Sequence, residues 1–284
     1  MRTFHHSDFP ADRLLADRRG SISVCVPARQ EAANIARVVA PLVALREAGV
    51  IDQVVVADAD SADGTAAIAS DLGAEVHRQS ALLPEFGPVL GKGDAMWRAL
   101  TVLRGDLVCF VDADSEDFGA HFALGLLGPL ACEPDVQFVK GFYRRPFKAN
   151  GTTQPNGGGR VTELTARPLL QAFHPELAAV HQPLAGEIAA RRELLERMAF
   201  ATGYAVEMGL LLDVHAAVGL DALAQVDLDV RQNRHQPLED LAPMAAAVLG
   251  ALTDRLRRDG RLAGEPEGLE RPPLSELAAL RRAG

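Results

Sequence analysis

Short apolar runs alternate with amphipathic stretches over the first half of the chain. The apolar runs have the length of buried strands and cover 21–27, 51–60, 74–79 and 106–114. The stretches between them have helical spacing and cover 32–49, 63–73 and 93–105. Strands that alternate with helices in this way predict an α/β fold with a mostly parallel sheet covered by helices. Ligands of such sheets bind at the carboxyl ends of the strands.

The second half of the chain has a less regular pattern. It predicts strands at 136–147 and 223–237, helices at 161–173, 204–219 and 238–260, and a loop at 148–160. The residues after Gly260 are rich in Pro, Gly and Glu, so we expect a mobile tail over 261–284. We find no internal repeat, which leaves one domain with a helical C-terminal part.

Acidic residues crowd the end of one apolar run. Three Asp-x-Asp triplets occur in the chain, at Asp58–Asp60, Asp112–Asp114 and Asp227–Asp229. The last lies inside an alternating strand, which is typical of a solvated strand face. The first is equally typical of a turn or helix cap and of a ligand site.

The stretch "GDLVCFVDADSED" (105–117) differs, because four carboxylates follow its strand within six residues. Mg²⁺ and Mn²⁺ bind one or two carboxylates and complete their shells with substrate phosphates. The stretch therefore predicts a divalent metal that is shared with a diphosphate.

Two familiar phosphate-binding motifs are absent. The stretch "GPVLGKGD" (87–94) has one residue too few between Gly87 and Gly91 for a P-loop, and Gly93 stands where Ser or Thr belongs. The first strand is followed by "PARQEAAN" rather than a dinucleotide-binding glycine motif. Lys92 lies between two glycines before a predicted helix, where it can approach a ligand or simply face solvent.

Two later stretches gather polar and basic side chains. "NGGGRVTEL" (156–164) combines backbone N–H groups, Arg160 and Thr162, and indicates an anion site or a flexible linker. "VRQNRHQP" (230–237), if extended, turns Arg231, Asn233 and His235 to one side, or forms a solvated edge. We assign no role to the remaining histidines, which are His5, His6, His77, His121, His174, His181 and His215.

Composition excludes several classes of function. Hydrophobic residues make up 48% of the 284 residues, enough for a sizeable core. No apolar run approaches a membrane span, and the N-terminus lacks the apolar centre of a signal peptide, so we expect a cytoplasmic protein. The net charge of −9 argues against nucleic acid as the main partner. The three cysteines lack metal-binding spacing.

The order of these motifs resembles that of a known family. "SVCVPARQEAANI", "VVVADADSADGT", "GKGDAMWRAL" and "CFVDADSED" resemble nucleotide-sugar glycosyltransferases of the GT-A fold. "FVKGFYRRPF", "GGGRVTELTARPLL", "QPLAGE", "GYAVEMGLLLD" and "AQVDLDVRQNRHQPL" are similar to the glucosyl-3-phosphoglycerate synthase family and its mannosyl relatives. The resemblance covers about Ser21 to Gly250.

The resemblance implies a GT-A, Rossmann-like fold with a mixed, mostly parallel sheet. It also implies a retaining hexosyltransferase that depends on Mg²⁺ or Mn²⁺ and is usually a homodimer. The enzyme would move glucose, with UDP-glucose the favoured donor, to the 2-hydroxyl of 3-phosphoglycerate. It divides the chain into an N-terminal extension (1–20), a nucleotide-sugar half (21–145), an acceptor half (146–260) and the tail (261–284).

The resemblance also implies roles for individual residues. The donor would contact Pro27, Ala28, Arg29, Glu31, Ala59, Lys92, Asp112, Leu184, Glu207 and Arg231, and Ala185, Gly186 and Glu187 would border the hexose with Leu184. The acceptor would contact Gly159, Arg160, Thr162 and Asn233. The catalytic residues would be Asp114, Lys92, Arg231 and Glu207.

The family pattern places His before Asn in the last loop, whereas this chain has Asn233 before His235. We expect His235 to bind the metal with Asp114.

Three alternatives stay open from the sequence. Mannose from GDP-mannose could replace glucose, since the two sugars differ at one hydroxyl. A sugar-1-phosphate nucleotidyltransferase would use a similar sheet, but it needs a glycine-rich basic loop after the first strand. A nucleotide-sugar sensor without catalytic activity is the third.

Overall fold

An eight-stranded sheet forms the centre of the molecule. The computed structural model describes residues 1–149, 152–154, 157–232 and 237–277. The strands lie in the order β1 (Arg2–His5), β11 (Leu223–Val230), β6 (Phe138–Arg144), β9 (Ile188–Arg191), β5 (Leu107–Phe110), β2 (Ile22–Ala28), β3 (Gln53–Asp58) and β4 (Glu75–Arg78). Neighbouring strands are parallel except where β9 runs antiparallel to β5 and β6. The predicted mixed, mostly parallel sheet is confirmed.

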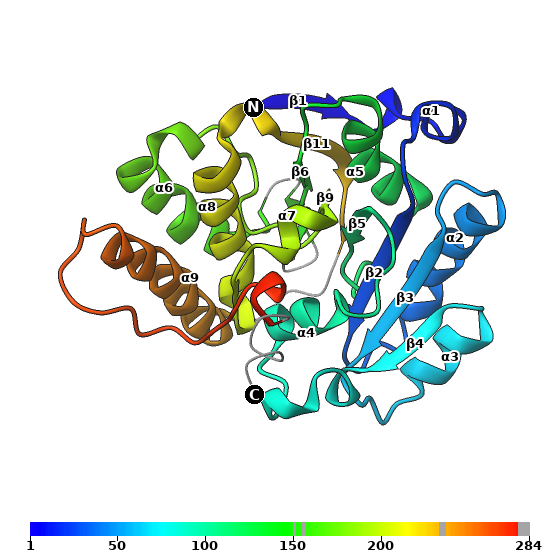
Figure 1. The fold of residues 1–284 in the computed structure, drawn as a ribbon, viewed down its shortest axis with the longest axis horizontal. Coiled ribbons are helices and arrows are strands. Elements are labelled where there is room, and N and C mark those ends of the chain that lie inside the picture. Colours follow the sequence, from blue (N-terminus) through cyan, green and yellow to red (C-terminus); the bar gives the residue numbers. More distant parts are fainter. Residues whose placement is uncertain (150–151, 155–156, 233–236, 278–284) are drawn as a thin grey trace.

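Helices cover both faces of the sheet. One face carries α1 (Ala11–Asp17), α2 (Ile35–Glu47), α3 (Thr65–Asp71) and α5 (Ala120–Cys132). The other carries α4 (Lys92–Ala99), α6 (Arg167–Phe173), α7 (Arg192–Glu196), α8 (Val206–Val218) and α9 (Leu238–Arg258). Figure 1 shows the strands between these two groups of helices.

Alternation along the strands explains the two layers. In β5, Leu107 and Cys109 join the core beneath α2 and α5, whereas Val108 and Phe110 join the core beneath α4 and α8. Each central strand is therefore apolar on both faces, which is the property from which the sequence predicted buried strands.

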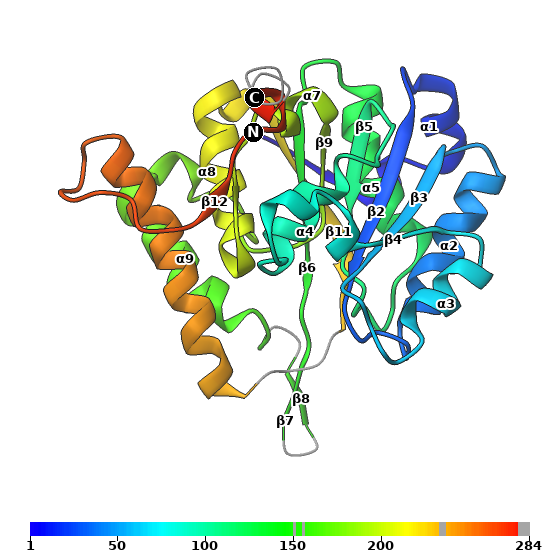
Figure 2. The ribbon, with the colours of Figure 1, turned by 60° about the horizontal axis from the view of Figure 1, so that its bottom comes forward.

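Two elements that the sequence did not predict lie at the centre of the fold. Helix α5 is apolar on nearly all sides, because it is buried between the sheet and its neighbours, and so it lacks an amphipathic period. Strand β9 is four residues long and contains two alanines, so its alternation is weak. The segment 148–160 also differs from a plain loop, because β7 (Phe147–Ala149) and β8 (Thr152–Gln154) form a hairpin that extends from the body in Figure 2.

The N-terminal extension is part of the sheet. Strand β1 pairs in parallel with β11 and forms one edge of the sheet. Strand β11 differs at Asp227–Asp229 from the solvated strand face that the sequence predicted. One extra residue stands between Asp227 and Val230, and Asp229 has a φ of 69°. The pair is therefore a β-bulge rather than a regular solvated face.

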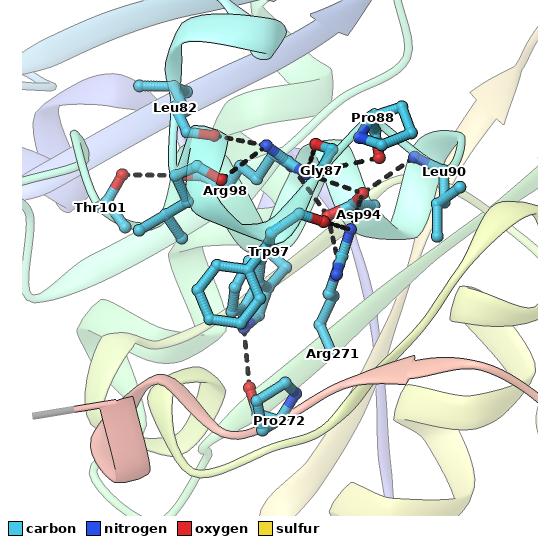
Figure 3. Close-up of polar contacts among 12 residues, drawn as sticks. Leu82, Gly87, Pro88, Leu90, Asp94, Trp97, Arg98, Thr101, Arg271 and Pro272 are labelled. Atoms are coloured by element: carbon cyan, nitrogen blue, oxygen red, sulfur yellow. Dashed lines mark hydrogen bonds and ion pairs between the residues drawn. The ribbon is translucent and has the colours of Figure 1, made fainter. Parts of the chain in front are cut away.

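The C-terminal segment is held on the body, contrary to the expected mobile tail. Strand β12 (Glu270–Arg271) pairs with β10 (Phe200–Ala201). Arg271 donates to both oxygens of the buried Asp94, at 2.9 and 2.8 Å, and the indole of Trp97 donates to the carbonyl of Pro272 at 2.8 Å. Figure 3 shows Arg98 on the same carboxylate, at 3.0 Å. Residues 261–277 thereby fasten α4, whose first residue is Lys92.

Among the described helices, none combines the length and the apolar character needed to cross a bilayer. The cytoplasmic location stays a prediction.

Replacing Arg271 with Ala should lower the free energy of unfolding by about 2–3 kcal/mol, because Asp94 stays buried with one cation fewer. Urea unfolding measures the change. Arg78→Ala serves as the control, because Arg78 is exposed and 4.0 Å from its nearest carboxylate, so its effect should stay within about 0.5 kcal/mol. Equal stability of Arg271→Ala and the unmodified chain would contradict the role given to the tail.

Candidate active site

Two cavities open at the edge of the sheet where the parallel strands end. The larger has a volume of about 610 Å³ and the smaller about 230 Å³. Lys92, Asp112, Asp114 and Tyr204 line both. The cavities therefore meet at the acidic end of β5, where the sequence predicted a ligand site.

The larger cavity is lined by loops that follow the first strands of the chain. Pro27 and Ala28 end β2, Arg29 and Glu31 follow it, and Ala59 follows β3. All five were predicted to contact the donor. Asp60 and Gln79 line the same cavity and were not predicted to contact it.

Lys92 bridges two carboxylates at the junction of the cavities. Its Nζ lies 2.5 Å from Asp112 Oδ1 and 2.8 Å from Glu207 Oε1. The flanking glycines allow this position, because a Cβ at Gly93 would lie 1.9 Å from the carbonyl oxygen of Ala201. The glycines thus let the start of α4 approach the 201–203 segment, which is why the stretch resembles a phosphate loop without being one.

Arg231 joins the remaining acids of the site. Its Nη2 lies 2.6 Å from Asp114 Oδ1 and 3.1 Å from Asp112 Oδ2. Its Nη1 lies 2.9 Å from Glu187 Oε1. The Nε of Arg231 donates to Ser115 Oγ at 2.9 Å, and Nη1 donates to the hydroxyl of Tyr143 at 2.7 Å.

Burial sets Arg231 and Glu187 apart from the other residues that were predicted to lie at the donor. Arg231 lines the smaller cavity, but its side chain is only 1% exposed and its N–H groups are directed to protein acceptors, so in this structure it positions the carboxylates. Glu187 is fully buried and paired with Arg231, and it lines neither cavity, so in this structure it offers no oxygen to a hexose. Of the "QPLAGE" stretch, Leu184 and Gly186 line the smaller cavity.

The network fixes the charge of its members. Burial alone would raise the pKa of Asp112, but Lys92 and Arg231 hold it well below its usual range. Burial would lower the pKa of Lys92, but Asp112 and Glu207 raise it well above its usual range. Asp112 and Lys92 are therefore charged at neutral pH.

The other two acids of the "DADSED" cluster have a structural role. The backbone N–H of Gln232 donates to Asp117 Oδ1 at 2.9 Å, and the N–H of Glu116 donates to the carbonyl of Gln232 at 2.9 Å. The loop after β5 thereby holds the chain just beyond Arg231. Asp112 and Asp114 thus line the cavities, whereas the carboxylate of Asp117 and the backbone N–H of Glu116 secure the neighbouring segment.

The smaller cavity has the character of an anion site. Gly158, Gly159, Arg160 and Thr162 line it at the start of the 162–173 helical segment, and Glu207 lies on its other side. Gly159, Arg160 and Thr162 were predicted to contact the acceptor. Arg145 also lines the cavity and was missed, although its place directly after a strand in "FYRRP" was a usable signal.

The donor set at the junction fits a divalent metal. Asp114 is 42% exposed in side-chain terms and lines both cavities, whereas Asp112 is 20% exposed and bound by both cations. One accessible carboxylate with room for phosphates beside it is the arrangement that Mg²⁺ and Mn²⁺ use. Asn233 and His235, the predicted acceptor and metal residues, lie outside the described residues.

Tyr204 is the most exposed aromatic residue at the junction of the cavities. It is 52% exposed, and no role was predicted for it although it is the first residue of the predicted helix (204–219) that carries Glu207. An exposed aromatic ring at this point can pack against a ligand that spans both cavities.

Comparisons with known proteins agree with this geometry. Residues 23–193 match glycosyl transferase family 2. The chain is 46% identical over 245 residues to the glucosyl-3-phosphoglycerate synthase of Mycolicibacterium smegmatis, covering 86% of this chain and 80% of that protein. It is 39% identical over 267 residues to the enzyme of the same name from Petrotoga mobilis, covering 92% and 82%.

Two solved structures are also similar to this one. The mannosyl-3-phosphoglycerate synthase of Rubrobacter xylanophilus superposes with a TM-score of 0.91 at 44% identity, covering 97% of both chains. The glucosyl-3-phosphoglycerate synthase of Mycobacterium tuberculosis, in complex with Mn²⁺, UDP-glucose and phosphoglyceric acid, superposes with a TM-score of 0.86 at 39% identity, covering 98% and 99%. The GT-A fold expected from the sequence is confirmed.

Lys140 is a buried cation beneath the network. It is 2% exposed on β6, and its Nζ donates to the carbonyl of Ala185 at 2.9 Å. Burial lowers its pKa to about 8, with Glu207 opposing the shift and Lys92 adding to it.

The low pKa of Lys140 gives a pH-dependent prediction. Between pH 8 and the ordinary pKa of 10.5, the unfolded chain holds a proton that the folded chain has lost, so folding stability rises with pH. Between pH 7 and pH 10, the free energy of unfolding of the unmodified chain should rise by about 2–3 kcal/mol relative to that of Lys140→Met. Urea unfolding at both pH values measures this, and a stability difference independent of pH would show that Lys140 is not desolvated.

Proposed function

We propose that this chain, which belongs to glycosyl transferase family 2 and within it to the glucosyl-3-phosphoglycerate synthases, transfers glucose from UDP-glucose to the 2-hydroxyl of 3-phosphoglycerate. The observation that carries the proposal is the meeting of two cavities at Lys92, Asp112 and Asp114. A transferase needs adjoining donor and acceptor sites, and the reacting atoms belong at their junction.

The donor would occupy the larger cavity. Its volume of about 610 Å³ is within the range of small-molecule sites. The nucleoside would lie along Pro27–Glu31 and Ala59, and the diphosphate would reach Lys92. Two of the three N–H groups of Lys92 are directed to Asp112 and Glu207, so one is available to a phosphate oxygen.

The acceptor would occupy the smaller cavity. A phosphorylated three-carbon acid carries two anionic groups, and this cavity offers the side chains of Arg145 and Arg160 beside backbone N–H groups of a glycine-rich turn. Glu207, across the cavity, would accept hydrogen bonds from sugar hydroxyls.

Asp114 would hold the divalent metal, with His235 as its proposed partner. When bound, the metal supplies Lewis-acid stabilisation for the charge that develops on the leaving diphosphate. A homologous structure contains Mn²⁺, and the oxygen-rich donor set would accept Mg²⁺ as well. Arg231 would keep Asp114 and Asp112 in place.

Retention of configuration needs no nucleophile from the protein in this arrangement. Glu207, the carboxylate nearest the sugar site, is paired with Lys92 at 2.8 Å, which lowers its nucleophilicity. We therefore propose that the acceptor hydroxyl attacks from the face that the diphosphate leaves, and that the departing phosphate takes its proton.

Mannose transfer from GDP-mannose is the second candidate, favoured by the superposition with the Rubrobacter enzyme. The nucleotidyltransferase alternative has no such support, since the family to which the chain belongs consists of glycosyl transferases.

Release of UDP from UDP-glucose and 3-phosphoglycerate should depend on both acceptor and metal. Asp114→Asn and Lys92→Met should each lower turnover by roughly 10²–10³-fold, because each removes a charge that stabilises the leaving group. Glu207→Gln should slow turnover without abolishing it. GDP-mannose is assayed in parallel.

The matched control is Asp135→Asn, an exposed carboxylate that precedes β6 at the opposite edge of the sheet, and it should have full activity. Turnover that survives EDTA and Asp114→Asn would contradict the proposed site. Complete loss in a folded Glu207→Gln would instead support a covalent glycosyl intermediate.

The resemblance to dimeric enzymes is supported by one apolar surface. Leu164 is 75% and Leu249 45% exposed, and with Leu169 and Ala245 they line a hollow between α6 and α9. We propose that a second copy of the chain covers it. Sedimentation velocity should show a dimer that Leu249→Glu weakens and that Leu15→Glu, on exposed α1, leaves intact. A monomer in the unmodified chain would refute this.

A further inference from the structure

Two histidines and an aspartate converge on the edge of the sheet next to α5. His5 ends β1, His6 follows it, and Asp229 lies in β11. His6 Nε2 lies 2.7 Å from Asp229 Oδ2, and His5 Nε2 lies 3.5 Å from Asp229 Oδ1. Potential ligand atoms of all three residues lie within 4.8 Å of one another. None of the three lines either cavity of the candidate active site.

The β-bulge in β11 produces this convergence. Asp229 is the extra residue between Asp227 and Val230, and its left-handed backbone is secured by its own N–H, which donates to Asp227 Oδ1 at 2.9 Å. A regular strand would not turn the carboxylate toward the end of β1.

The distances suit a small dication. Zn²⁺ binds imidazole nitrogen and carboxylate oxygen at about 2.0–2.2 Å, so the ligand atoms of a tetrahedral site lie roughly 3.3 Å apart. His5 Nε2 lies 3.5 Å from Asp229 Oδ1, close to that value, whereas His6 Nε2 is hydrogen-bonded to Asp229 Oδ2 at 2.7 Å, a contact that a bound metal would replace. The three side chains are 19–49% exposed, so a metal and a solvent ligand can reach them.

Neighbouring groups hold the imidazoles in place. His5 Nδ1 accepts a hydrogen bond from the backbone N–H of Ser7 at 3.2 Å and lies 2.8 Å from Ser7 Oγ, so Ser7 holds the ring while its Nε2 faces Asp229. The backbone N–H of His5 donates to Asp8 Oδ2 at 2.9 Å, and the ring of His6 lies 4.7 Å from that of His121. The nearest cation, Arg144, is 3.9 Å from Asp229 and 64% exposed.

We propose that His5, His6 and Asp229 bind one transition-metal dication of the zinc class, with solvent as the fourth ligand. Two imidazoles and one carboxylate suit Zn²⁺, Co²⁺ or Ni²⁺, whereas Mg²⁺ prefers oxygen ligands. The site is separate from the proposed catalytic metal and does not rest on the proposed reaction. It ties β1 to β11 two residues before Arg231.

Co²⁺ binding tests the proposal, because four-coordinate Co²⁺ absorbs visible light far more strongly than six-coordinate Co²⁺. The probe is the metal alone, added to the chelator-treated full chain without a histidine tag. We expect one strongly absorbing Co²⁺ per chain, displaced by Zn²⁺. The signal should persist in Asp114→Asn, which disables the catalytic site.

Single variants define the ligands. His6→Gln and Asp229→Asn should each weaken Zn²⁺ affinity by roughly 100-fold or more, and Ser7→Ala by about tenfold. His77→Gln, a histidine on β4 at the other edge of the sheet, should change nothing. Far-ultraviolet circular dichroism confirms that each variant is folded.

Two results would overturn the site. One is strong absorption that survives in His6→Gln. The other is Co²⁺ that binds only in weakly absorbing form and is lost in Asp114→Asn, which would leave His5, His6 and Asp229 as hydrogen-bonding partners only.

Discussion

Charge pairing at the end of β5 is the interaction on which the arrangement of the candidate site depends. Two cations, Lys92 and Arg231, hold four carboxylates, those of Asp112, Asp114, Glu187 and Glu207, within a few ångströms of one another. Burying any of these groups alone would be costly, because a low-dielectric environment disfavours unpaired charge. The excess of carboxylates over these two cations leaves negative charge at the junction of the cavities, and a divalent ion would neutralise it there.

The direction of β9 supplies part of this network. Because β9 runs against its neighbours, its amino end lies at the edge where β5 and β6 end. The residues just before it, Gly186 and Glu187, therefore lie at the site. If β9 were parallel to its neighbours, its amino end would lie at the opposite edge of the sheet. Gly186 must lack a side chain, since a Cβ would lie 2.3 Å from Lys92 Nζ and 2.5 Å from the Asp112 carboxylate.

The parallel half of the sheet was predictable because a strand that is buried on both faces consists of a continuous apolar run, as in 106–114. Site residues at and just beyond the ends of those runs were predictable for the same reason: Pro27, Ala28, Arg29 and Glu31 line the larger cavity, and Asp112 and Asp114 line both. Helix α5 and strand β9 escaped prediction because complete burial and small residues erase the periodic signal. The docking of 261–277 escaped prediction because the partners of Arg271, chiefly Asp94 and the Phe86 carbonyl, are distant in sequence, and composition carries no information on such contacts.

The orientation of Arg231 could not be read from the sequence because it depends on the bulge. Simple alternation through "VDLDVR" would place Arg231 on the same face as Asp227, which is the face of Lys140 and α8. The extra residue at 229 shifts the register, so that Val230 rather than Asp229 pairs with Arg144. Arg231 then falls on the opposite face, beside Tyr143, where its guanidinium meets Glu187 and Ser115. The one extra residue in β11 thus determines whether Arg231, the second cation beside Lys92, reaches the acidic end of β5.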